Sequence, residues 1–136
     1  MIVELPASLR EQAVALWEEC GLTRPWNDPW TDLDRALGGE SSTVLALVSD
    51  DSLLGTAMVG HDGHRGWVYY LAVSPAAQGA GHGRALMVAA EEWVAARGIP
   101  KIQLMVRTGN EPVLGFYGRL GYEVQDTVVL GRRLDG

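Results

Sequence analysis

The residues best suited to chemistry form a glycine-rich stretch, 78–84, with the sequence QGAGHGR. It follows an apolar run typical of a strand and leads into a segment with helical periodicity. Three alternate glycines, Gly79, Gly81 and Gly83, leave the backbone open to a closely approaching ligand. The first N–H groups of a helix have no partner inside the helix and carry partial positive charge. The stretch therefore predicts a binding site for a pyrophosphate group.

Two common nucleotide motifs do not fit this spacing. A P-loop requires Lys and then Ser or Thr after its last glycine, whereas Gly83 is followed by Arg84 and Ala85. A dinucleotide fingerprint requires G-x-G-x-x-G, but the glycines here follow G-x-G-x-G. It also requires an acidic residue about 20 positions later, where this chain has Lys101. Both nucleotide readings therefore fail.

The elements that must position this turn are predicted from periodicity, capping residues and glycine or proline breaks. In chain order they are a short edge strand 1–5, helices 8–20 and 29–38, strands 43–48, 53–60 and 67–73, a helix 83–97, a strand 101–106, a helix 110–120, and a closing hairpin of 122–124 with 128–132. Residues 67–73 are strongly apolar, which predicts a central strand covered on both faces. The strand–helix–strand unit 67–106 is a right-handed crossover, so its two strands are parallel. The rest of the sheet is expected to be mostly antiparallel, which gives a mixed α/β fold.

Two segments carry a resemblance to a known family. Residues 78–83 fit the coenzyme A signature of the GCN5-related N-acetyltransferase (GNAT) superfamily, Gln/Arg-x-x-Gly-x-Gly/Ala, residue by residue. Residues 110–122, NEPVLGFYGRLGY, resemble the second coenzyme-binding segment of that family, with Val113 where alanine is more frequent. Residues 22–29 and 60–66 look like those of the YpeA-type branch.

The resemblance implies a single N-acetyltransferase domain over residues 1–136. It also implies the GNAT-like acyl-CoA N-acyltransferase fold. In that fold, helices cover both faces of a twisted, mostly antiparallel sheet that is split between two central parallel strands. Here those strands would be 67–73 and 101–106.

The same resemblance implies acetyl-CoA as cosubstrate. The pantetheine arm would lie between the two parallel strands, where backbone groups near Leu71 and Val73 would pair with its amides. A backbone N–H near Val73 would polarise the thioester carbonyl. The glycine turn would hold the pyrophosphate, with added contacts from the side chains of His82 and Arg84. The cofactor-binding residues expected on this basis are Leu71, Val73, Gln78, Gly79, Gly81, His82, Gly83, Arg84, Asn110 and Tyr117.

The implied reaction is direct attack by a neutral primary amine on the thioester in a ternary complex. Tyr117 matches the family's usual general acid, and a phenol with a pKa of about 10 is protonated at neutral pH. Its alternative role is packing in the core. Asn110 would contact the coenzyme or the leaving sulfur, and it also suits a helix N-cap. The general base is open between Tyr70, Tyr69, Asp62 and a water relay, because the third long strand carries no carboxylate.

The acceptor side is expected near the first two helices and the tip of the central hairpin. Trp26, Asn27, Asp28 and Trp30 place two indoles around a carboxylate, which could hold a cation. The alternative is that Asp28 caps a helix and the tryptophans pack. Tyr70 is a further candidate for acceptor binding. The acceptor itself is open between a peptide N-terminus, a protein lysine, a polyamine, an amino acid and an aminoglycoside.

The composition limits the partners. The chain has 136 residues and a net charge of −6, so it repels phosphate backbones and nucleic acid is not expected. An amine acceptor, small molecule or peptide, would be attracted. No apolar run approaches the roughly 18 residues of a membrane span, and the N-terminus lacks a signal peptide, which predicts a cytoplasmic protein with no membrane partner. The protein would be a monomer or a homodimer.

Other site classes are less well supported. His61 and His64 form H-x-x-H without further ligands at a suitable spacing, so no metal site is expected. Cys20, the single cysteine, is interpreted as a small buried hydrophobe. The main alternative to an enzyme is a non-catalytic acyl-CoA-binding or sensing domain of the same fold.

Overall fold

The computed structural model describes residues 1–135. The chain divides into two compact units, Met1–Met105 and a second unit that begins at Val106, and each is described by itself. No helix in the described part of the chain is both long and apolar enough to cross a membrane.

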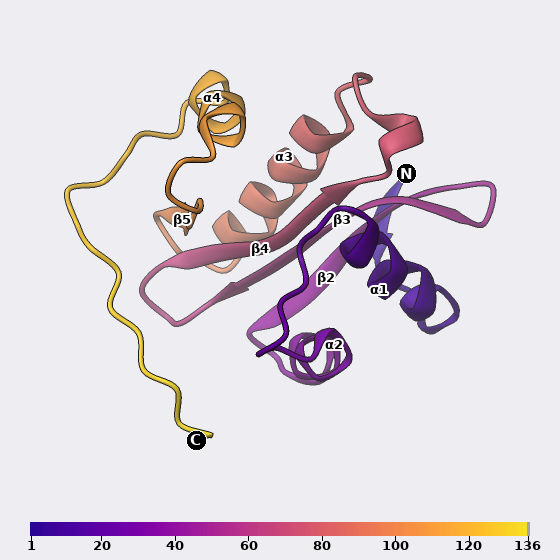
Figure 1. The fold of residues 1–136 in the computed structure, drawn as a ribbon, viewed down its shortest axis with the longest axis horizontal. Coiled ribbons are helices and arrows are strands. Elements are labelled where there is room, and N and C mark those ends of the chain that lie inside the picture. The colour runs from indigo at the N-terminus through magenta and orange to yellow at the C-terminus, as the bar shows by residue number, and fades with distance from the viewer. Residues whose placement is uncertain (136) are drawn as a thin grey trace. The chain divides into compact units, whose positions relative to one another are not determined.

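The first unit holds a five-stranded sheet with the strand order β1-β2-β3-β4-β5 (Figure 1). The first three pairings are antiparallel and the last, between β4 and β5, is parallel. The elements are β1 (Ile2–Glu4), η1 (Ala7–Leu9), α1 (Arg10–Glu19), α2 (Pro29–Gly38), β2 (Ser42–Ser49), β3 (Ser52–His61), β4 (Gly66–Val73), η2 (Pro75–Ala77), α3 (His82–Ala95) and β5 (Ile102–Leu104). This order confirms the mixed α/β fold expected from the sequence.

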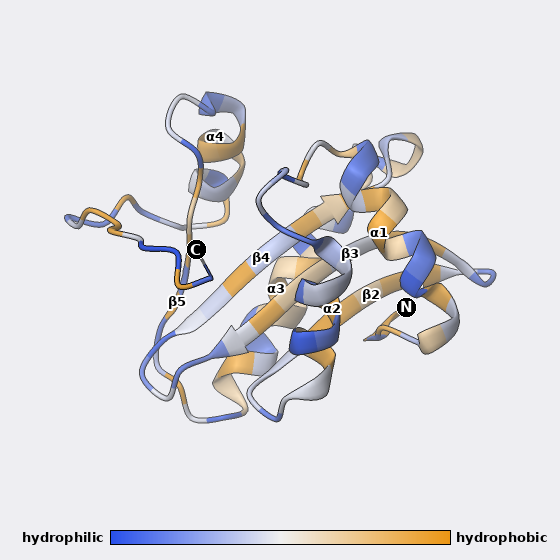
Figure 2. Cartoon of the chain, turned by 60° about the horizontal axis from the view of Figure 1, so that its bottom comes forward, coloured by the Kyte–Doolittle hydropathy of each residue, from blue (hydrophilic) through white to orange (hydrophobic). Residues whose placement is uncertain are grey.

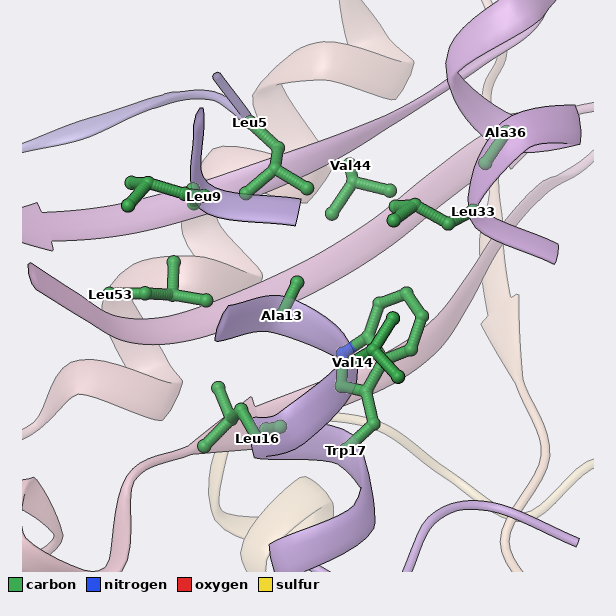
Figure 3. Close-up of a cluster of buried hydrophobic side chains, with 12 residues drawn as sticks. Leu5, Leu9, Ala13, Val14, Leu16, Trp17, Leu33, Ala36, Val44 and Leu53 are labelled. Carbon is green, nitrogen blue, oxygen red and sulfur yellow. The ribbon is translucent and has the colours of Figure 1, made fainter. Parts of the chain in front are cut away.

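Helices cover both faces of the sheet, as expected. Helices α1 and α2 lie on one face and α3 lies on the other (Figure 1). The α1/α2 side holds the larger core cluster, in which the side chain of Trp17 is fully buried (Figure 3). On the α3 side Leu86 packs with Leu47 and Ala57. Strand β2, buried between the two layers, is largely hydrophobic along its length (Figure 2).

Strand β4 contains an irregularity that the sequence did not predict. Tyr69 pairs with Met58 and Ala72 pairs with Thr56, so one residue of β3 lies opposite two residues of β4. The extra residue is Tyr70, whose φ of 51° is left-handed and unfavourable for a bulky side chain. Because of this bulge both side chains lie on the α1/α2 face: Tyr70 stacks on Trp17 of α1, and Tyr69 lies opposite Met58, which packs against the same core cluster. The expectation that β4 is covered on both faces is wrong at Tyr69, which is 45% exposed.

The two parallel strands separate early. Only Gly66–Val68 of β4 pair with β5, through Ile102–Leu104. Strand β5 therefore has three residues rather than the six predicted. The second half of β4, residues 69–73, has no partner strand on the β5 side within the described chain. This leaves an open strand edge directly before the glycine turn.

The second unit contains one helix, α4 (Glu111–Arg119), close to its predicted bounds. The hairpin predicted for 122–124 and 128–132 does not form: no strand follows β5 in residues 105–135. Val124 and Leu130 are 87% and 92% exposed. The physical reason is that residues 128–130 are consecutively apolar rather than alternating, no tight-turn dipeptide joins the halves, and a lone hairpin is marginal. Without this hairpin the parallel pair lies at the end of the sheet, not at its centre.

Candidate functional site

The glycine turn has the strand–turn–helix geometry that its sequence predicts. Strand β4 ends at Val73, and α3 begins at His82 after the short helix η2. Gly79 and Gly81 have φ values of 86° and 80°, which side chains rarely adopt. A Cβ atom at either glycine would meet no atom within 4 Å, so the space above this backbone is open. The turn is therefore shaped by its glycines and accessible to a ligand.

The start of α3 is left without a cap. Gly81 occupies the N-cap position and offers no side-chain hydrogen bond, and the first turn contains no acidic residue. His82 and the exposed Arg84 stand there instead. The positive charge of Arg84 is unfavourable at a helix N-terminus unless an anion is bound, because the helix dipole is positive there. Free N–H groups and a basic first turn together suit a bound phosphate.

The side chain of Gln78 has a contact within the protein. Its Nε2 atom donates to the carbonyl oxygen of Val73 at 3.1 Å, which closes the turn onto the end of β4. The thiol of Cys20 lies 3.6 Å from the same oxygen. Burial is the largest cause that raises the pKa of Cys20, so the thiol stays protonated at neutral pH. Cys20 packs against the core cluster but is only partly buried, so the expectation of a buried residue holds in part. Gln78 therefore shapes the turn, and in this structure it does not point away from the protein.

A hydrogen-bond chain holds the bulge in β4. The indole Nε1 of Trp17 donates to Thr56 Oγ1 at 2.9 Å, and Thr56 Oγ1 donates to the carbonyl oxygen of Tyr70 at 2.9 Å. The ring of Tyr70 stacks on Trp17 with centroids 4.0 Å apart. Its hydroxyl donates to Asp32 Oδ2 of α2 at 2.7 Å. One strained residue is thus held by its carbonyl, its ring and its hydroxyl.

Sequence reasoning missed Trp17, Thr56 and Asp32 as residues near the site. Two signals were available. Asp32 follows Asp28 by four positions, which places both on one face of α2. Thr56 is the only polar residue between the two ends of the apolar strand β3, and a buried hydroxyl requires partners. The sequence around Trp17 indicated only that this residue lies on the apolar face of α1, so its hydrogen bond to Thr56 could not be predicted.

The structure tests the side-chain candidates for the general base. Burial and the nearby Asp32 raise the pKa of Tyr70, whose hydroxyl already donates to that carboxylate. Burial, followed by the charge of Asp62, raises the pKa of Tyr69. Asp62 accepts from the backbone N–H groups of Arg65 and His64, which lower its pKa to about 2. Both phenols stay protonated and the carboxylate is a weak base, so none of the three suits the role at neutral pH.

Of the residues expected to bind the acceptor, Asp28 caps a helix, whereas Trp26 and Trp30 are exposed. Asp28 is the N-cap of α2 and accepts from Trp30 N at 3.0 Å and from Thr31 Oγ1 at 2.8 Å. Its capping role, the alternative reading, is therefore confirmed. Trp26 and Trp30 are 55% and 42% exposed, so neither residue belongs to the buried core, and their role at an acceptor site stays a prediction. The backbone N–H of Asn27 donates to Arg24 O at 3.0 Å, which closes the loop before α2.

Of the expected catalytic residues of the second unit, Asn110 lies just before α4 and Tyr117 lies within it. Asn110 is the N-cap of this helix, and its Oδ1 accepts from Val113 N at 3.4 Å. Tyr117 is 9% exposed, with its ring edge-on to Phe116 and Tyr122. Burial raises the pKa of Tyr117 to about 12. The phenol is therefore protonated at neutral pH, as an acid must be, although the raised pKa makes it a weaker one.

The H-x-x-H pair serves the β3–β4 turn. His61 Nδ1 accepts from Gly63 N at 3.0 Å, and the backbone N–H of His64 donates to Asp62. Within residues 1–135 no group of three or more His, Cys, Asp or Glu side chains is arranged to hold a metal ion.

Comparisons with a family model and with known proteins both match this chain to acetyltransferases. The model of the acetyltransferase (GNAT) family matches residues 7–122. An acetyltransferase from Yersinia pestis (strain Pestoides F) is 45% identical over 124 residues, which cover 91% of this chain and 88% of that protein.

Solved structures share the fold at low identity. A transcriptional regulator from Bacillus halodurans C-125 matches with a TM-score of 0.83 and 19% identity, covering 98% of this chain and 99% of that chain. The aminoglycoside N-acetyltransferase AAC(6′)-Iy in complex with CoA has a TM-score of 0.83 at 16% identity, with 98% and 94% covered. AAC(6′)-Iy with the bisubstrate analogue CoA-S-monomethyl-acetylneamine matches at 0.82 and 16%, with 98% and 97% covered. The matched motifs, the fold and the 45% identical relative together show that this chain belongs to the acetyltransferase (GNAT) family.

Proposed function

We propose that the protein is an N-acetyltransferase that moves an acetyl group from acetyl-CoA to a primary amine. The observation that carries this proposal is the uncapped start of α3, where Gly79 and Gly81 open the backbone and no acidic residue stands in the first turn. Such a helix start is suited to a pyrophosphate, which coenzyme A supplies. Family membership and the name of the Yersinia pestis relative support transfer of an acetyl group.

The coenzyme-binding residues follow from the open edge of β4 and the turn after it. Leu71 and Val73 would face the pantetheine arm with backbone groups, and Gln78 would shape the turn rather than touch the coenzyme through its side chain. The N–H groups that open α3 would bind the pyrophosphate, assisted by the charge of Arg84. The residues in this role are Leu71, Val73, Gln78, Gly79, Gly81, His82, Gly83 and Arg84. A structure of AAC(6′)-Iy in complex with CoA, on the same fold, supports this choice of cosubstrate.

The chemistry is direct transfer in a ternary complex. The amine nitrogen attacks the thioester carbonyl carbon, a C–N bond forms, and the C–S bond breaks. Tyr117, protonated at neutral pH, would give its proton to the departing sulfur, and Asn110 would contact the coenzyme near that sulfur. The ammonium proton of the acceptor would leave through water, because Tyr69, Tyr70 and Asp62 are all poor bases. A bisubstrate analogue bound to AAC(6′)-Iy supports a ternary complex.

The acceptor would approach from the α1/α2 face, where the indoles of Trp26 and Trp30 are exposed and Asp28 and Asp32 are acidic. Neither carboxylate has a salt-bridge partner within residues 1–135. The whole chain has a net charge of −6, and this acidic face would attract a cationic amine and repel nucleic acid. Tyr70 and Asn27 would border the same region. We further propose a cytoplasmic protein without a membrane partner, acting as a monomer or a homodimer.

The family match and the relatives support one functional domain over residues 1–136. The family model begins in the first unit and ends in the second, at residue 122. The Yersinia pestis relative aligns over 91% of the chain. We therefore propose that both units belong to one acetyltransferase domain. The narrower YpeA-type branch stays a prediction.

A second candidate function is a non-catalytic acyl-CoA-binding or sensing domain. The observation that favours it is the lack of a competent side-chain base among Tyr69, Tyr70 and Asp62. A structure with the same fold is named a transcriptional regulator from Bacillus halodurans C-125, which supports a sensing role as the alternative.

The first experiment is calorimetric titration of the purified protein with acetyl-CoA, with NAD and ATP as control ligands. Binding of acetyl-CoA alone is expected, in the micromolar range. An amine panel with colorimetric detection of the free thiol then separates the two functions, since only the enzyme releases CoA. If the folded protein binds none of the three ligands, both coenzyme-dependent functions are wrong.

A further inference from the structure

The buried polar contacts of the α1/α2 face converge on a single peptide group of β4. Thr56 is 0% exposed, which is unusual for a polar residue. Valine has nearly the same shape and would suit an apolar site in β3. The Thr56 hydroxyl hydrogen bonds to the carbonyl oxygen of Tyr70 and to the indole of Trp17. The hydroxyl of Thr56 therefore supplies a hydrogen-bond donor to the Tyr70 carbonyl oxygen, which a valine at this position could not do.

The direction of each hydrogen bond is determined by chemistry. An indole N–H can only donate, so Trp17 Nε1 must give its proton to Thr56 Oγ1. The single hydroxyl proton of Thr56 is then available for the Tyr70 oxygen at 2.9 Å. All three groups are satisfied, and the hydroxyl has one orientation. The chain Trp17–Thr56–Tyr70 therefore acts as a rigid bracket for that carbonyl.

Holding the carbonyl of Tyr70 also sets the N–H of Leu71. The peptide bond between them is trans, since no cis peptide occurs in the described chain. In a trans peptide the C=O and the following N–H point in opposite directions. Because the Tyr70 carbonyl points to Thr56 on β3, the Leu71 N–H points away from it. Residues 69–73 have no strand partner on the β5 side, so this N–H is directed toward an unpaired region.

We infer that Thr56 is a positioning residue, which holds the Tyr70–Leu71 peptide so that the Leu71 N–H meets the thioester carbonyl of acetyl-CoA. The inference rests on the proposed function and names Leu71 as the donor, in place of the N–H near Val73 expected from the family resemblance. The strained φ of 51° at Tyr70 supports it, because such strain persists only where surrounding contacts determine it. A donor fixed before the substrate arrives costs no reorganisation during the reaction.

The first test uses the unmodified protein. Two-dimensional NMR spectra of the ¹⁵N-labelled protein are recorded first with the protein saturated with CoA and then with the protein saturated with acetyl-CoA. The two ligands differ only in the acetyl group. The Leu71 amide resonance is expected to shift between the two complexes more than the amides of the rest of β4. If the Leu71 resonance is the same in both complexes, the inference is wrong.

The second test measures polarisation of the carbonyl in variants of Thr56. Isotope-edited infrared spectra of bound [1-¹³C]acetyl-CoA are compared with the free molecule. The wild-type protein and Thr56→Ser, which keeps the hydroxyl, are expected to lower the carbonyl frequency. Thr56→Val and Thr56→Ala are expected to lose most of that shift. The Ser and Ala variants lack the same methyl group and differ only in the oxygen, so packing loss is matched between them.

Activity provides a third readout once an amine acceptor is identified. Loss of an oxyanion donor costs about 10²- to 10³-fold in kcat, so a misoriented donor in Thr56→Val should cost roughly 10- to 100-fold, with the KM for acetyl-CoA little changed. A purely structural Thr56 would instead lower the melting temperature and leave kcat per folded molecule and the infrared shift intact. That result would overturn the inference. Failure of the wild-type protein to bind acetyl-CoA would instead overturn the proposed function on which it depends.

Discussion

Helices α2 and α3 begin in opposite ways. At α2 the N-cap Asp28 accepts from Trp30 N, Pro29 occupies the first turn, and Asp32 adds negative charge near the positive end of the dipole. At α3 the N-cap is a glycine without a side chain, and Arg84 stands in the first turn. Helix α2 thus completes its own start, whereas α3 leaves its start for a ligand. The difference distinguishes a helix that stabilises the fold from a helix whose start is suited to binding a ligand.

The largest effect is expected from closing the open helix start. Gly81→Glu places a carboxylate where the pyrophosphate would lie, and like charges about 4 Å apart near a protein surface repel by about 4 kcal/mol. We expect the affinity for acetyl-CoA, measured by calorimetry, to fall roughly a thousandfold.

The matched control for this change is Gly98→Glu. Gly98 follows the other end of α3, has a φ of 76°, and its Cβ would also meet open space. It lies about 25 Å along the helix from Gly81. The control suffers the same backbone strain and adds the same charge, so it should bind acetyl-CoA normally. Equal loss of affinity in both variants would contradict the placement of the pyrophosphate.

Helix α4 extends the comparison to the second unit. It starts like α2, with a side-chain cap from Asn110 and with Glu111 in its first turn, so its contribution should come from a side chain. Tyr117→Phe is expected to lower kcat by about a hundredfold, because general acid catalysis contributes about 10²- to 10⁴-fold. The affinity for acetyl-CoA should change little. Tyr122→Phe, on a neighbouring ring, is the control, and an unchanged kcat in Tyr117→Phe would mean that Tyr117 only packs.

The capped helix should show the reverse phenotype. Asp28→Ala removes the cap of α2 and is expected to lower the free energy of unfolding by about 1 kcal/mol. Urea titration measures this loss. Its affinity for acetyl-CoA should equal that of the wild-type protein, because α2 does not take part in the proposed coenzyme site. A large loss of affinity in Asp28→Ala would remove the distinction between the two helix starts.

The smallest effect concerns the hydrogen bond that ties α2 to β4. Tyr70→Phe removes the hydroxyl that donates to Asp32, and because the pair is only partly buried we expect a loss below about 1 kcal/mol. The pKa of Tyr70 is raised by folding, so its contribution is complete below pH about 10 and is lost as the pH rises further. The stability of Tyr70→Phe should therefore fall less steeply above pH 10. Identical alkaline curves for wild type and Tyr70→Phe would contradict the assignment.

Local signals explain what could be predicted. The order of helices and strands up to residue 119, the glycine turn and the caps at Asp28 and Asn110 all depend on residues within a few positions of one another. The predicted hairpin of 122–132 failed because its apolar residues indicate strand propensity only, and a strand also requires a neighbour to pair with.

By itself, the sequence determined the mixed α/β class, the family and the turn that opens α3, because capping and glycine geometry act over a few residues. Only the tertiary structure decided that Tyr70 adopts a left-handed backbone, that Thr56 meets its carbonyl, and that Asp32 receives its hydroxyl. These contacts join residues 14 and 38 positions apart. The physical reason is that a buried hydroxyl or a strained φ is stable only when the packed fold supplies its partners, and no local pattern records which partners those are.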